Sequence, residues 1–161
     1  MIHNVMRNRG RNMKQNLYDQ ETFYKGYKAI RERAYNYNNL LEQPALSAVM
    51  PDVSGKVVLD IGCGSGDFAA KCVSEGAARV IGIDISENMI ADAKEKYTDG
   101  RLDFIRVAFE DLELEDASID LVVSSLAFHY MADFRSVMEK VSTVLRDGGE
   151  LVCHRGRRPG C

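Results

Sequence analysis

The ten residues 57–66, VVLDIGCGSG, decide the fold of this chain. An apolar run that ends in an acidic residue is typical of a buried parallel strand, and the three alternating glycines predict a sharp turn into a helix. Glycines remove side chains from such a turn, so that a ligand can lie against backbone N–H groups where the helix begins. The stretch therefore predicts a strand-to-helix unit and the place where a ligand binds.

Strand-like and helix-like patterns alternate on both sides of this turn. Further buried strands are expected at residues 79–84, 102–107, 119–125 and 150–153. Helices are expected over residues 19–33 and 43–50, between Gly66 and Gly76, from the N-cap Ser86 to residues 99–100, and from the N-cap Asp133 to residues 148–149. This alternation predicts an α/β fold with a doubly wound, mostly parallel sheet of about five strands.

Length and composition indicate one domain. The chain has 161 residues, of which 45% are hydrophobic and 28% charged, as is ordinary for a globular domain. Residues 1–17 contain four Lys or Arg, no acidic residue and no hydrophobic period, which predicts a disordered leader. The domain itself is expected over residues 18–153, and residues 154–161 form an atypical tail.

Charge and cysteine content argue against several classes of protein. A formal net charge of -3 gives no electrostatic footprint for a nucleic acid backbone. The four cysteines form no C-x-x-C pair and lack histidines at metal-ligand spacing, so neither a zinc site nor a disulfide framework is expected. Without an apolar run of membrane-spanning length or a signal core, the protein is predicted to be cytoplasmic, with no membrane partner.

The candidate site residues follow the strands, because doubly wound sheets bind ligands beyond the carboxyl ends of their strands. Residues 60–66 follow the first strand, Asp84 closes the second, Phe109 and Glu110 follow the third, and Ser125 closes the fourth. An acidic residue about twenty positions beyond a glycine turn suits acceptance from two ribose hydroxyls. Together the turn and Asp84 predict a ligand that contains a nucleoside.

Asp67 helps to decide which class of nucleoside-containing ligand binds, one with a pyrophosphate or one without. It stands where the dinucleotide turn G-x-G-x-x-G has its third glycine, and an acidic side chain there opposes a pyrophosphate. No Gly-Lys-Ser/Thr follows the turn, so a P-loop is absent. The turn therefore favours a ligand with a carboxylate and an amine but no phosphate, while an NAD-type oxidoreductase with a variant turn stays open as an alternative.

Five motifs occur in order across about residues 18–152: VLDIGCGSG, IGIDIS with ENMI, FEDLEL, SSLAFHY and LRDGGEL. In these motifs the chain resembles the class I S-adenosylmethionine-dependent methyltransferases, in particular the small-molecule type with a helical N-terminal lead. The resemblance implies S-adenosylmethionine as the cofactor and a small-molecule methyl acceptor as the partner.

The resemblance also implies roles for single residues. The cofactor-binding set is Asp60, Gly62, Cys63, Gly64 and Gly66 around the methionine part, Asp84 at the ribose, Ile85 and Met89 against the adenine, Phe109 and Glu110 at the adenine edge, and Ser125 near the methionine amine. Tyr18, Tyr24 and Arg31 of the lead helix would help to close the pocket. His129 and Tyr130 follow the fourth strand and are the candidate substrate residues, with a structural role for both left open. No fixed catalytic residue is required, because methyl transfer depends mainly on alignment.

Two departures from the family pattern stand out. Ala108 occupies the position where the family commonly has an aspartate that accepts from the adenine amino group. Without that hydrogen bond, cofactor binding would be weaker by about 0.5–1.5 kcal/mol. The ending HRGRRPGC cannot form the further strands with which family members continue, so a C-terminal truncation is expected. The fifth strand would then be an edge capable of self-association, and a cofactor-binding module without full catalytic competence is a further alternative.

Overall fold

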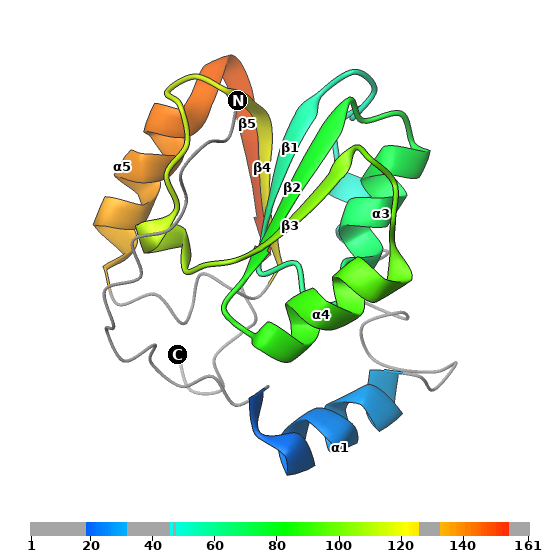
Figure 1. Ribbon diagram of the computed structural model, residues 1–161. Coiled ribbons are helices and arrows are strands. Elements are labelled where there is room, and N and C mark those ends of the chain that lie inside the picture. The colour runs from blue at the N-terminus through cyan, green and yellow to red at the C-terminus, as the bar shows by residue number, and fades with distance from the viewer. Residues whose placement is uncertain (1–18, 32–45, 47, 126–132, 155–161) are drawn as a thin grey trace.

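The computed structural model describes residues 19–31, 46, 48–125 and 133–154. In chain order the elements are α1 (Glu21–Arg31), β1 (Val57–Ile61), α3 (Asp67–Ser74), β2 (Arg79–Asp84), α4 (Glu87–Lys96), β3 (Leu102–Arg106), the short 3-10 helix η3 (Phe109–Asp111), β4 (Ile119–Ser125), α5 (Phe134–Val144) and β5 (Leu145–His154). The strands form one parallel sheet in the order β3-β2-β1-β4-β5, with helices on both faces (Figure 1). This confirms the predicted doubly wound α/β fold.

The strand β1 lies at the centre of the sheet, between β2 and β4. Val58 lies opposite Val80 on one side and Leu121 on the other, and these side chains belong to the core beneath α3 and α4. The alternate residues of the same strands, such as Leu59 and Ile81, belong to a second core beneath α5. Strands buried on both faces explain why the sequence is apolar almost without interruption. The order of the strands reverses between β1 and β4, and doubly wound sheets generally bind their ligands at such a reversal, beyond the carboxyl ends of the strands.

Local capping signals fix the ends of the helices. Ser86 is the N-cap of α4, and its hydroxyl accepts from the N–H of Met89 at 3.2 Å. Asp133 is the N-cap of α5, and its carboxylate accepts from the N–H groups of Arg135 and Ser136. Gly76, with a φ of 97°, closes the turn behind α3. These three capping predictions are confirmed.

The boundary between α5 and β5 differs from the prediction. Residues 148–149 were expected to end the helix, but α5 ends at Val144 and β5 begins at once with Leu145. The N–H groups of Ala117 and Ser118 donate to the carbonyls of Thr143 and Val144, so these last carbonyls of α5 have partners outside the helix. The glycine pair instead lies in a bulge, where residues 146–149 face the single residue 120 of β4.

Several predictions fall on residues outside the described ranges. These are the leader over residues 1–17, Tyr18, residues 155–161 of the predicted tail, and the candidate substrate residues His129 and Tyr130. The tail was predicted to begin at residue 154, but the backbone of His154 pairs with Ser125 and still belongs to β5. Within the described ranges, no helix is both long and apolar enough to cross a membrane. Among the same residues, no three His, Cys, Asp or Glu side chains cluster as they would to hold a metal ion.

Candidate functional site

The glycine turn joins β1 to α3 at the carboxyl edge of the sheet. Gly62, Gly64 and Gly66 have φ angles of 80°, 52° and 81°, in the left-handed region that favours glycine. The N–H groups of Gly62 and Cys63 both donate to the carbonyl of Ile83, at 2.8 and 3.0 Å. The turn is therefore held against the end of β2, and its conformation depends on all three glycines.

Asp84, the last residue of β2, bonds directly to this turn. Its Oδ2 accepts from the N–H of Gly64 at 3.1 Å, and its Oδ1 accepts from the N–H of Ser86 at 2.9 Å. Burial raises the pKa of the Asp84 carboxyl, although these hydrogen bonds act in the opposite direction. The structure thus brings together the glycine turn and the acidic residue that the sequence predicted as a pair.

Asp60 lies in β1 with only 4% of its surface exposed. Its neighbours across the sheet are Gly82 of β2 and Val123 of β4. The Oδ2 atom accepts no hydrogen bond from the described residues. Burial, together with the nearby charge of Asp84, raises the pKa of the Asp60 carboxyl to about 7. A buried carboxyl with an unpartnered oxygen suits a cationic or hydrogen-bond-donating ligand group.

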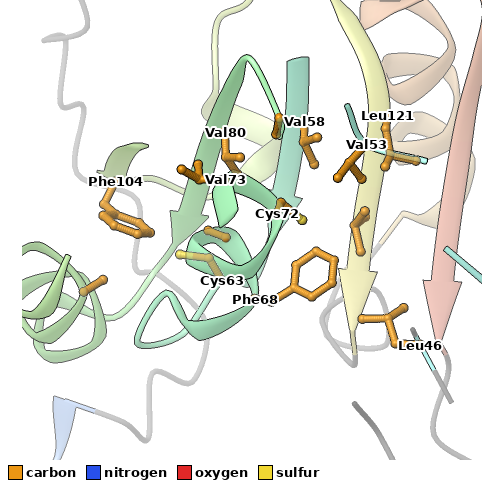
Figure 2. Close-up of a cluster of buried hydrophobic side chains, with 14 of the residues drawn as sticks. Leu46, Val53, Val58, Cys63, Phe68, Cys72, Val73, Val80, Phe104 and Leu121 are labelled. Carbon is orange, nitrogen blue, oxygen red and sulfur yellow. The ribbon is translucent and has the colours of Figure 1, made fainter. Parts of the chain in front are cut away.

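Phe104 of β3 packs on the backbone of the turn. A Cβ atom on Gly66 would lie 2.6 Å from the ring Cζ, and one on Gly82 would lie 2.9 Å from the ring Cδ1. Figure 2 shows the ring in the same core cluster as Cys63. Gly82 was not predicted as a site residue, although a glycine inside a buried strand signals a close approach of other atoms. In contrast, no atom of the described residues lies within 4 Å of a Cβ on Gly64, so they leave this part of the turn open.

Asp67, at the start of α3, is held by the end of α4. Its carboxylate accepts from the hydroxyl of Tyr97 at 2.6 Å and forms an ion pair with Lys96. Burial alone would raise the pKa of this carboxyl, but the hydrogen bonds from Lys96 and Tyr97 lower it. Lys96 therefore compensates the negative charge that was expected to oppose a pyrophosphate.

The remaining predicted cofactor residues lie around the same edge of the sheet. Met89 and Phe109 are buried, with 3% and 2% of their surface exposed, and Phe109 belongs to the core beneath α5. Ile85 is half-buried and Glu110 is exposed. The backbone of Ser125 ends β4 opposite β5, and its side chain lies outside the described atoms. The cofactor contacts of these five residues stay predictions.

The lead helix α1 lies against α4 (Figure 1). The Tyr24 hydroxyl donates to the carboxylate of Asp92, and Lys28 forms an ion pair with the same carboxylate at 3.3 Å. Asp19, two residues before α1, accepts from the hydroxyl of Ser86 at 2.7 Å. Tyr24, which the resemblance assigned to pocket closure, is thus engaged with α4. No local signal in the sequence reveals the contact between Asp19 and Ser86.

Comparisons with known proteins agree with the geometry. The family described as "Methyltransferase domain" matches residues 59–153. An uncharacterized protein of Haemophilus influenzae is 32% identical over 147 residues, which cover 88% of this chain and 58% of that protein. The 27-O-demethylrifamycin SV methyltransferase of Amycolatopsis mediterranei is 35% identical over 111 residues, which cover 66% of this chain and 40% of the relative.

A solved structure gives the same result. The crystal structure of an S-adenosylmethionine-dependent methyltransferase from Mesorhizobium loti aligns with a TM-score of 0.67 at 38% identity. The alignment covers 70% of this chain and 51% of that one. The chain thus spans about half the length of the relatives that it matches.

Proposed function

The chain belongs to the methyltransferase domain family, and from this premise we propose that it binds S-adenosylmethionine and directs its methyl group to a small-molecule acceptor. The observation that carries the proposal is the junction between Gly64 and Asp84. There a backbone N–H of the glycine turn and the carboxylate that ends β2 are in direct contact. The carboxyl edge of the sheet thus offers the Asp84 carboxylate as an acceptor for ribose hydroxyls, beside a glycine turn at the start of α3, where an amino acid carboxylate would be favoured.

The residues present fit this cofactor. The open side of Gly64 lets a ligand approach the backbone of the turn. The carboxylate of Asp84 has capacity for ribose hydroxyls beyond the backbone N–H groups that it already accepts, because two oxygens provide about four acceptor sites. The unpartnered oxygen of Asp60 complements a cofactor with an amine and a sulfonium, since an adjacent positive charge favours the ionised carboxyl.

Methyl transfer from S-adenosylmethionine requires no fixed catalytic side chain. When bound, S-adenosylmethionine supplies a methyl group on a positively charged sulfur, and the acceptor attacks the methyl carbon in line with the carbon–sulfur bond, so that the sulfur leaves as a neutral thioether. The protein contributes mainly by holding donor and acceptor in that geometry. If the acceptor must lose a proton, His129 is the proposed base, with Tyr130 beside it along the chain. The Amycolatopsis relative, named for a rifamycin acceptor, supports a small molecule as the substrate class.

Calorimetric titration tests the cofactor. We expect S-adenosylhomocysteine, the demethylated product, to bind and NAD not to bind. Tighter binding of NAD would overturn the proposal in favour of the oxidoreductase alternative. Transfer of a radiolabelled methyl group to a panel of small molecules then tests the activity. Cofactor binding without transfer to any acceptor would support the alternative of a binding module.

Replacement of the ribose acceptor gives a direct prediction. Asp84→Asn is expected to weaken binding of S-adenosylhomocysteine about 10- to 100-fold, because charge-assisted hydrogen bonds contribute about 1.5–3 kcal/mol. Asp103→Asn is the matched control, since Asp103 lies on the neighbouring strand and pairs with Arg79 at the amino end of β2. Titration calorimetry measures both variants. Equal affinities for the two would show that Asp84 does not hold the ribose.

A further inference from the structure

Asp19 is joined to the proposed ribose acceptor by hydrogen bonds that run through Ser86. The Oδ1 atom of Asp19 accepts from the Ser86 hydroxyl at 2.7 Å and from the N–H of Asn88 at 3.3 Å. The side chain of Ser86 is fully buried, so water does not compete for its hydroxyl. Asp19, which precedes the lead helix α1, therefore contacts α4 at its N-cap residue, Ser86.

The Ser86 hydroxyl has one proton, and its direction is determined by the neighbouring groups. The oxygen accepts from the N–H of Met89, so the proton is directed to Asp19. The backbone N–H of Ser86 donates to Asp84, whose second oxygen accepts from Gly64. A continuous series of hydrogen bonds thus extends from Asp19 through Ser86 and Asp84 to the glycine turn.

Arg106 compensates the charge of Asp19. Its guanidinium lies 3.6 Å from Asp19 Oδ2, pairs with Glu87 at 2.7 Å, and donates to the carbonyl of Ile85 at 3.2 Å. The same arginine therefore contacts the lead segment, the first turn of α4 and the residue that follows Asp84. Of these contacts, the bond to the Ile85 carbonyl restrains the backbone next to Asp84 directly.

From this arrangement we propose that Asp19 is a positioning residue for the cofactor. By holding Ser86, it sets the orientation of the Asp84 carboxylate, so that docking of α1 and binding of the ribose are coupled. The inference rests on the proposed function above. Because such coupling is reciprocal, a bound cofactor strengthens the docking of the lead helix by the same factor by which Asp19 strengthens cofactor binding.

A second contact of the lead helix provides a matched control. The hydroxyl of Tyr24 and the amine of Lys28 contact Asp92, and the same hydroxyl lies 3.5 Å from the carbonyl oxygen of Asn88; neither Asp92 nor that carbonyl belongs to the series of bonds through Ser86 and Asp84. Tyr24→Phe therefore loosens α1 without removing a bond from the series. A lead helix that acts only by covering the site would make Tyr24→Phe and Asp19→Ala equivalent.

The test combines three variants with two ligands in titration calorimetry. Asp19→Ala is expected to weaken binding of S-adenosylhomocysteine about 5-fold, the equivalent of one lost hydrogen bond. With the 2′,3′-dideoxyribose analogue, which has no hydroxyls for Asp84, the same substitution is expected to change the affinity less than about 2-fold. Asp19→Asn, which keeps an oxygen acceptor for Ser86, should recover most of the affinity, and Tyr24→Phe should affect both ligands equally.

Hydrogen exchange in the absence of ligand gives an independent readout. Asp19→Ala should speed exchange of the Ser86 amide, whereas Tyr24→Phe should speed it much less, because only the first change removes the acceptor of the Ser86 hydroxyl. Equal losses with both ligands, or an unchanged Ser86 amide, would overturn the positioning role. Failure of the unaltered protein to bind S-adenosylhomocysteine would instead overturn the proposed function, so the two failures are distinguishable.

Discussion

Gly66→Ala is expected to lower the free energy of unfolding by about 3 kcal/mol. A Cβ at this position would lie 2.6 Å from the Phe104 ring and 3.1 Å from the Cβ of Ala93. The ring is 6% exposed and cannot move aside without disturbing the core, so overpacking costs about 1–3 kcal/mol. The φ of 81° adds about 1–2 kcal/mol, because alanine tolerates the left-handed region poorly. Urea denaturation measures the change.

Gly64→Ala separates the two costs. Gly64 also has a left-handed φ, of 52°, but within the described part of the chain no atom lies within 4 Å of the added Cβ. This variant is expected to lose only the conformational part, about 1–2 kcal/mol. In a second test, Phe104→Leu should reduce the additional cost of Gly66→Ala, because the smaller side chain leaves room for the methyl group. If Gly66→Ala and Gly64→Ala are equally destabilising, Phe104 does not pack on the turn as described.

Asp60→Asn is expected to remove a large pH dependence of stability. The pKa of the Asp60 carboxyl is about 7 in the folded chain, against 3.8 ordinarily. Between these values the folded state binds more protons than the unfolded state, so Asp60 makes stability fall as the pH rises. Each pH unit in that interval costs about 1.4 kcal/mol of stability. From pH 4 to pH 8 the asparagine variant should therefore gain about 3–4 kcal/mol relative to the unaltered protein.

The measurement is the free energy of unfolding of both proteins, from urea titrations at several pH values. Groups that titrate in both proteins cancel in the difference between the two curves. Parallel curves would mean that the Asp60 carboxyl is not desolvated as its burial indicates. The same variant should bind S-adenosylhomocysteine more weakly, because asparagine cannot supply a negative charge to the amine of the ligand.

Patterns that are local in sequence were sufficient to predict most of the fold. The apolar composition of the strands indicates that they are buried. Ser86 and Asp133 cap helices by accepting from N–H groups two or three residues further along the chain. The end of α5 could not be read in this way. A glycine with a positive φ closes a helix in one context and forms a bulge in another, and Gly148 does the second because β5 pairs with β4 immediately after the helix.

The site was predictable to the extent that its parts follow strands. Gly64 and Asp84 lie at the ends of neighbouring parallel strands, so their proximity follows from topology. The partners that control them do not follow from any spacing. Ser86 is 67 residues from Asp19, and Lys96 is 29 residues from the carboxylate of Asp67 that it neutralises. Such contacts depend on how separate helices pack, which no periodic pattern in one segment specifies.

The central position of β1 has a consequence for how the protein is made. Its partner β2 follows within the next two dozen residues, whereas β4 follows much later, as the bond from the Val57 N–H to Asp120, 63 residues away, illustrates. During synthesis, β1, β2 and β3 can therefore pair while one edge of β1 is still open. Until α5 emerges from the ribosome, side chains such as Leu59 and Ile81 lack the contacts that Val137, Val141 and Val144 of this helix provide in the same core. We expect the nascent half-sheet to be the stage at which this protein most needs a chaperone.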